Sequence, residues 1–182
     1  MFTPPAIDFC SRCGHPTQLT LPNDGDTRQR AICTHCGFIH YQNPLNVVGT
    51  IPVADDGRIL LCKRNIEPRW GTWTLPAGFM ELNETLEEGA ARETVEEAGA
   101  DFEMGRLFSI VSVPHVGQVH LYFCARLRSL EFAPGSETLE ARLFAPEDIP
   151  WATLSFRTVA LTLRHYLANP HDTHVHCLSL QP

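Results

Sequence analysis

The sequence predicts an α/β protein in which strands lie between two layers of helix, preceded by a small cysteine-rich module. Three observations support this prediction. Two C-x2-C pairs occur before residue 40. An apolar stretch rich in β-branched residues, LNVVGTIPVA, is followed by a turn and a second apolar stretch, RILLCKR. Two later segments, about 83–99 and 153–168, carry the start signals and apolar pattern of helices.

The cysteine module consists of Cys10, Cys13, Cys33 and Cys36. Two residues between thiolates let one tight turn present both sulfurs to one ion, and two such turns complete a tetrahedral Zn²⁺ shell. A closed shell leaves no position for water, so we expect a structural zinc ion. The alternative is a set of buried thiols without metal. The other three cysteines, Cys62, Cys124 and Cys177, lie in apolar contexts typical of small buried residues.

The expected domain boundary follows this module. We assign residues 1–41 to a leader and zinc ribbon, and residues 42–182 to the main domain. In the main domain, Asp55-Asp56-Gly57 predicts a hairpin turn between the first two strands. The segment EPRWGTWTLPAGF is rich in Trp and Pro and predicts a loop with short extended pieces.

The first helix is expected to begin at Asn83, a favourable N-cap, and to end at Gly99. The later segments predict two strands joined by a turn, a short strand, a single helical turn and a second long helix. Their ranges are 106–113, 118–127, 139–144, 146–149 and 153–168.

Composition excludes some functions. The 182 residues are 43% hydrophobic with a formal net charge of −7, and no long basic run is present. Nucleic acid is therefore an unlikely partner, because phosphate backbones attract clustered Lys and Arg. The N-terminal stretch MFTPPAIDFC lacks a signal-peptide pattern, and no window approaches the roughly 20 apolar residues of a membrane span. We expect a cytoplasmic protein without membrane contact.

The first predicted helix carries three crowded glutamates. At about 100° per residue, Glu93, Glu96 and Glu97 lie close together on one face. Like charges at this spacing destabilise a helix, and a hard divalent cation such as Mg²⁺ would offset that cost. Arg92 has Glu88 and Glu96 as carboxylate neighbours four positions away. The alternative is a solvated acidic face.

The order of residues in this segment resembles the Nudix box, G-x5-E-x7-R-E-U-x-E-E-x-G-U, where U is a bulky aliphatic residue. The fixed positions are matched by Gly78, Glu84, Arg92, Glu93, Glu96, Glu97 and Gly99. Thr94 and Ala100 depart from the U positions. The resemblance implies a Nudix α/β/α sandwich with a mixed sheet, behind a small zinc ribbon.

The same resemblance implies roles for individual residues. Mg²⁺ or Mn²⁺ would be bound by Glu93, Glu96 and Glu97, with the carbonyl of Ala77 as a further ligand. Arg92 would orient a glutamate, and Glu84 would brace the loop. Water would attack one phosphorus of a nucleoside diphosphate linked to another group. A further glutamate from a later loop often completes such sites; Glu140 is our candidate, with Glu137 second, and both could equally be surface residues.

The substrate is narrowed by the rest of the sequence. A four-cysteine ribbon also precedes the Nudix domain of NADH pyrophosphatases, but SIVSVPHVGQVHLYF replaces their S-Q-P-W-P-F-P-x-S motif. Over a longer pattern the chain resembles the Nudix branch that contains ADP-ribose and FAD pyrophosphatases. The segments that carry this resemblance are RAICTHCGFIHYQNP, WTLPAGFMELNET, PHVGQVHLYFCARL and LEARLFAPEDIPW. Trp73 or Phe79, or else Trp70 or Tyr41, would stack on a ring, and Arg64 or Arg69 would meet phosphates. Core aromatics and solvated arginines are the alternative.

The expected function is therefore Mg²⁺- or Mn²⁺-dependent cleavage of ADP-ribose or FAD with release of AMP. The first alternative is an NADH or other dinucleotide pyrophosphatase. The second is a non-catalytic Nudix module that senses a nucleotide, with the ribbon docking a partner. A small nucleotide is the expected partner, and a homodimer is compatible with the resemblance.

Overall fold

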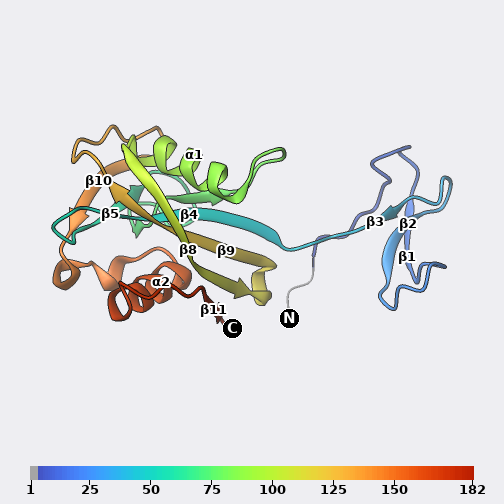
Figure 1. Cartoon of the computed structure of the whole chain (residues 1–182). Helices are drawn as coiled ribbons and strands as arrows, with labels where there is room; N and C mark the ends of the chain where they lie inside the picture. The colour runs from blue at the N-terminus through green and yellow to red at the C-terminus, as the bar shows by residue number, and fades with distance from the viewer. Residues whose placement is uncertain (1–3) are drawn as a thin grey trace. The chain divides into compact units, whose positions relative to one another are not determined.

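The computed structural model describes residues 4–182 and divides the chain into two units, Met1–Pro44 and Leu45–Pro182 (Figure 1). The first unit contains a three-stranded antiparallel sheet in the order β1-β2-β3. Its strands are β1 (Thr17–Thr20), β2 (Arg30–Cys33) and β3 (Ile39–His40). Two of the four cysteines that cluster in this unit, Cys10 and Cys33, are buried.

The second unit is built on an eight-stranded mixed sheet, six of whose strands run in the order β10-β5-β4-β9-β8-β11. The short strands β6 and β7 pair with β5 and β4. The strand bounds are β4 (Leu45–Val53), β5 (Ile59–Arg64), β6 (Trp73–Thr74), β7 (Ala77–Phe79), β8 (Phe102–Val113), β9 (Gln118–Leu127), β10 (Thr138–Phe144) and β11 (His176–Ser179).

The central strand β4 explains why the sheet is mixed. It pairs in parallel with β9 along its whole length, and it pairs antiparallel with β7. The expected turn after β4 is present, with the amide of Ala54 donating to the carbonyl of Arg58. The hairpin itself is short, because only Val53 and Ile59 are in register before the strands diverge. Beyond this point β4 pairs with β7 instead of β5, over Val47, Val48 and Gly49.

Two helices cover the two faces of this sheet (Figure 1). Helix α1 (Leu86–Ala98) packs Ala90 on Val48, Leu121 and Phe123. Helix α2 (Arg157–Ala168) packs Val159 and Leu163 on the opposite face, in a core that includes Ile51, Phe108 and Tyr122. The predicted α/β/α layers are confirmed.

Several predicted boundaries are corrected. Helix α1 is capped by Thr85, whose side chain accepts from the amide of Glu88 in a capping box, and not by Asn83. Asn83 instead has a φ of 69°, a left-handed conformation that asparagine tolerates. The second helix begins at Arg157, after a separate 3-10 turn at Trp151–Thr153. The 3-10 turns Pro114–Val116 and Pro146–Asp148 lie where turns were expected, and β11 was not predicted.

Within the described residues, the helices are all too short or too polar to cross a lipid bilayer.

Candidate active site

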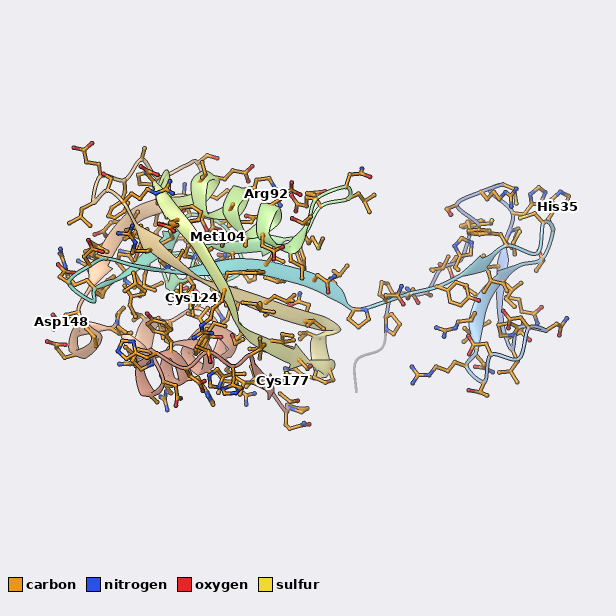
Figure 2. All side chains as sticks on the ribbon, viewed as in Figure 1. His35, Arg92, Met104, Cys124, Asp148 and Cys177 are labelled. Atoms are coloured by element: carbon orange, nitrogen blue, oxygen red, sulfur yellow. The ribbon has the colours of Figure 1, made fainter. Side chains whose placement is uncertain are left out.

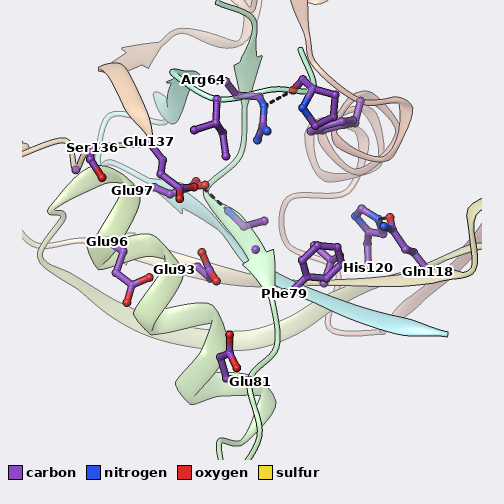
Figure 3. Close-up of a pocket in the computed structure, with 17 residues that line it drawn as sticks. Arg64, Phe79, Glu81, Glu93, Glu96, Glu97, Gln118, His120, Ser136 and Glu137 are labelled. Carbon is purple, nitrogen blue, oxygen red and sulfur yellow. Dashed lines mark hydrogen bonds between the residues drawn. The ribbon is translucent and has the colours of Figure 1, made fainter. Parts of the chain in front are cut away.

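A pocket of about 690 Å³ lies in the second unit, where the C-terminal half of α1 meets β7 and the end of the sheet (Figure 3). All three predicted glutamates of α1 line it: Glu93, Glu96 and Glu97. Its other lining residues come from β4, β5 and its following loop, β7 and its following loop, β9, the loop before β10 and the residue before α2. They are Val47, Arg64, Ile66, Pro68, Ala77, Gly78, Phe79, Glu81, Gln118, His120, Gly135, Ser136, Glu137 and Phe156.

Arg92 on α1 (Figure 2) forms hydrogen bonds with several acidic residues of this site. Its Nε and Nη2 atoms donate to the two carboxylate oxygens of Glu84, at 3.0 and 2.9 Å. Its Nη1 atom donates to Glu93 at 2.7 Å and to Glu96 at 3.1 Å. Its Nη2 atom also reaches the carbonyl of Phe79 at 3.1 Å. One guanidinium therefore orients two pocket carboxylates and ties α1 to β7 and to the loop before the helix.

Glu97 is the most enclosed of the three glutamates, with 8% of its surface exposed. Its Oε2 atom accepts from the backbone amide of Ala77 at 3.2 Å. Burial, reinforced by the nearby Glu93 and Glu137, raises the pKa of Glu97 to about 8. Burial also raises the pKa of Glu93. These carboxylates share a region where negative charge is costly without a cation.

The pKa of Glu84 is shifted in the opposite direction. The hydrogen bonds from Arg92 and from the amide of Glu81 lower its pKa to about 2. Glu84 therefore stays ionised as the fixed partner of Arg92, which agrees with a bracing role rather than a proton-transfer role.

Two glycines allow the close approach of α1 to its neighbours. A Cβ atom on Gly78 would lie 2.3 Å from the carboxylate of Glu93. A Cβ atom on Gly89 would lie 2.6 Å from Oε1 of Glu84 and 2.9 Å from a methyl group of Val48. A side chain at either position would displace a carboxylate that Arg92 holds.

The chemistry of the pocket fits a hard divalent cation. Its donors are carboxylate oxygens, the ligands that Mg²⁺ and Mn²⁺ prefer. Among residues 4–182, the group of side chains placed closely enough to hold a metal ion as they stand is the four cysteines and not the three glutamates. Glu96 is 59% exposed and accepts a hydrogen bond from Arg92.

Of the other predicted site residues, some line the pocket and some lie outside it. Arg64, Phe79 and Ala77 line the pocket; Arg64 donates to the carbonyl of Pro68 and lies over Phe156. Ala77 contributes its amide to Glu97, which was not anticipated.

Trp73 and Glu140 were predicted at the site but do not line the pocket. Trp73 is 6% exposed and packs edge-on against Phe144 in the core, outside the pocket. Glu140 lies on β10 opposite Lys63, and its carboxylate points to Arg142. Glu137, the second candidate, lines the pocket instead, because it precedes the irregular start of β10 and faces α1 (Figure 3).

Gln118 and His120 line the pocket but were not predicted. They are two residues apart on β9, so they share one face of the sheet. That alternation was visible in the sequence, but nothing in it indicated that this face opens into a pocket.

The four cysteines of the first unit form the second candidate metal centre. Their sulfur atoms lie 3.4 Å apart for Cys13 and Cys33, 3.5 Å for Cys13 and Cys36, and 3.8 Å for Cys10 and Cys36. A tetrahedron with Zn–S bonds of about 2.3 Å has sulfurs about 3.8 Å apart. Backbone amides of Arg12 and His35 point at two of the sulfurs, as expected for thiolates. The cluster fits Zn²⁺.

Two family models match the chain and together span most of it. One, described as NUDIX domain, matches residues 44–163. The other, a zinc ribbon described as Nudix N-terminal, matches residues 8–42.

Curated relatives at about 30% identity are NAD-capped RNA hydrolases. NudC from Haemophilus influenzae (strain PittGG) is 31% identical over 164 residues, which cover 85% of this chain and 60% of the relative. NudC from Salmonella heidelberg (strain SL476) is 31% identical over 143 residues, covering 78% and 53%. The chain thus spans little more than half the length of these relatives.

Two solved structures resemble the chain to different degrees. A NUDIX hydrolase from Nitrosomonas europaea is 47% identical with a TM-score of 0.87, covering 96% of this chain and 100% of the other. An ADP-ribose pyrophosphatase from Streptococcus suis 89-1591 is 24% identical with a TM-score of 0.58, covering 76% and 100%. The second likeness concerns the fold alone.

Proposed function

Because the chain belongs to the Nudix hydrolase family, we propose that it is a divalent-cation-dependent pyrophosphohydrolase. It cleaves the diphosphate of a nucleoside diphosphate linked to another group. One observation carries this proposal: Glu93, Glu96 and Glu97 line one pocket together with Glu137, and Glu97 is buried there. The same pocket has Arg64 on its wall, which suits a phosphate.

In the proposed mechanism, Glu93, Glu96 and Glu97 hold Mg²⁺ or Mn²⁺. When bound, the cation neutralises phosphate oxygens and lowers the pKa of water. Arg92 keeps Glu93 and Glu96 oriented toward the pocket, and the amide of Ala77 keeps Glu97 in place. In the metal-free pocket the raised pKa of Glu97 keeps its carboxyl group largely protonated at neutral pH. Once a cation displaced that proton, the carboxylate would be available to accept a proton from water.

The substrate proposed first is ADP-ribose or FAD, with AMP as a product. NADH and other dinucleotides are the second candidates, favoured by the curated relatives, which are named NAD-capped RNA hydrolases. All of these contain an adenosine diphosphate, and a pocket of about 690 Å³ falls in the size range of small-molecule sites.

A panel of substrates tests the proposal. The purified chain is incubated with ADP-ribose, FAD, NADH, NAD⁺ and NAD-capped RNA, each with Mg²⁺ or Mn²⁺, and products are identified by mass. Release of AMP, or of RNA with a 5′-phosphate from the capped RNA, is expected for the true substrates. No turnover on any member with either metal would remove the proposal.

We also predict a competition between protons and metal at Glu97. Its ordinary pKa is 4.5 and burial raises it to about 8, so its carboxylate fraction grows as pH rises through that range. At limiting Mg²⁺ the rate should rise with pH with a midpoint near 8, and saturating Mg²⁺ should move the midpoint to lower pH. A midpoint that does not depend on Mg²⁺ concentration would contradict this role.

The stability of the metal-free protein should change in the same range. The pKa of Glu97 is higher in the folded state than in the unfolded state. Protonated Glu97 therefore stabilises the fold in full below about pH 4.5, and this stabilisation is lost as the pH rises through about 8. Added Mg²⁺ should restore stability at high pH, which a thermal melt series with and without Mg²⁺ measures.

A further inference from the structure

The pocket has a second end, away from the glutamates, formed by Gln118, His120 and Phe79 (Figure 3). The sheet register brings them together. Phe79 on β7 pairs with Val47 on β4, and Val47 pairs with His120 on β9. Phe79, Val47 and His120 all line the pocket, so their side chains form one row across the adjacent strands β7, β4 and β9. Phe79 is 51% exposed and presents an aromatic surface to the pocket.

His120 is a neutral imidazole that holds the amide of Gln118. Burial lowers the pKa of His120 to about 4, so at neutral pH it has one N–H group. Nε2 of His120 lies 3.0 Å from Oε1 of Gln118. Nδ1 of His120 is buried and has no partner among residues 4–182. A buried N–H without an acceptor is rarer than a buried lone pair without a donor, so the proton belongs on Nε2, donating to Gln118.

This bond fixes which way the Gln118 amide faces. Oε1 accepts from His120 and keeps a second lone pair. The NH₂ group of Gln118 has no hydrogen-bond partner within the described chain and is available to a ligand. Gln118 therefore offers one acceptor and one donor in a fixed order, and the amide cannot rotate by 180° without losing the bond to His120.

We propose that Gln118 recognises the amino edge of an adenine ring, with His120 as the positioning residue that fixes the amide and Phe79 as the surface on which the base stacks. This inference rests on the proposed function. Adenine presents an amino donor beside a ring-nitrogen acceptor, and an amide side chain pairs with both at once. Hypoxanthine presents a carbonyl acceptor in place of the amino group, so it meets the Gln118 amide in the wrong order.

Arg92 connects Phe79, at the proposed adenine end of the pocket, to the glutamates at its other end. The carbonyl of Phe79 accepts from Nη2 of Arg92, whose Nη1 atom holds Glu93 and Glu96. A base stacked on Phe79 is therefore held at a defined distance from the carboxylates, as cleavage of an attached diphosphate requires.

The test compares ADP-ribose with its hypoxanthine counterpart, inosine diphosphate ribose, which differs only at this edge of the base. The wild-type chain should favour ADP-ribose in kcat/KM by about 5- to 150-fold, equivalent to about 1–3 kcal/mol. Gln118→Leu should bring the ratio close to 1 by lowering kcat/KM for ADP-ribose. His120→Phe should also reduce the ratio, but by raising kcat/KM for the hypoxanthine substrate, since the amide is then free to rotate.

Gln181→Leu, at an exposed glutamine near the C-terminus, is the matched control and should keep the wild-type ratio. A wild-type ratio near 1, or a ratio that Gln118→Leu and His120→Phe leave unchanged, would overturn the inference while leaving the hydrolase intact. If neither variant folds, a wild-type ratio near 1 still overturns it and a ratio in the expected range supports it. Absence of turnover on both substrates would instead count against ADP-ribose as the substrate, which is the first choice of the proposed function.

Discussion

Replacing Glu97 with glutamine is expected to lower kcat by about 10²- to 10⁴-fold, the range for loss of a group that moves a proton in the reaction. The substitution keeps the shape of the side chain and can still accept the amide of Ala77. It removes the negative charge that would bind the cation and the basic oxygen that would accept a proton. The fold should persist, because an uncharged amide is less costly to bury than a carboxylate.

Glu87→Gln is the matched control for this experiment. Glu87 lies on the same helix, in its exposed first turn, and does not line the pocket. Initial rates of both variants are measured on the best substrate of the panel, and circular dichroism reports the fold. A Glu97→Gln variant with wild-type turnover would remove Glu97 from the mechanism. A wild-type chain that binds nucleotides without turnover would favour the sensor alternative.

Removal of zinc is expected to unfold the first unit and to leave the second unit folded. The first unit has short strands and few buried side chains, so we expect its stability to depend on a bound ion. Structural zinc sites contribute about 10–16 kcal/mol of apparent binding free energy in small zinc domains. We expect one Zn²⁺ per chain by elemental analysis, and none after Cys10→Ser combined with Cys33→Ser.

Amide NMR spectra of the whole chain measure the consequence. In the double variant, signals from β1, β2 and β3 should collapse to unfolded positions while those of β4 and β9 persist. Cys177→Ser is the control, since Cys177 is an exposed cysteine on β11. Zinc content near zero in the wild type, or dispersed signals from β1 to β3 after the ligands are lost, would contradict a structural zinc site.

Local features were the most predictable from sequence. The cysteine spacing indicated the cluster because tight turns place each pair of sulfurs together without help from distant residues. The helix over Leu86–Ala98 and the shared pocket of its glutamates followed from helical periodicity. Arg92 was expected to have Glu88 and Glu96 as neighbours. It contacts Glu96, and also Glu93 and Glu84, the last of which lies eight positions earlier in the sequence.

Features that depend on strand pairing were less predictable. Glu137 lines the pocket and Glu140 does not. The register of β10 with β5 is irregular between Thr138 and Glu140, and the sequence does not reveal this irregularity. Trp73 was expected at the pocket, but its strand β6 pairs with β5 and turns the ring into the core against Phe144. The place of His120 beside Val47 depends on the pairing of β9 with β4, and these strands are far apart in the sequence.

The central claim is that the glutamates of α1 bind a divalent cation in the pocket. Crystals soaked in Mn²⁺ test it most directly, since the anomalous signal of manganese locates the ion. We expect a peak within coordination distance of a carboxylate oxygen of Glu97 and of at least one of Glu93 and Glu96. Saturating Mn²⁺ with no peak between these carboxylates, or a peak only elsewhere on the chain, would contradict the claim.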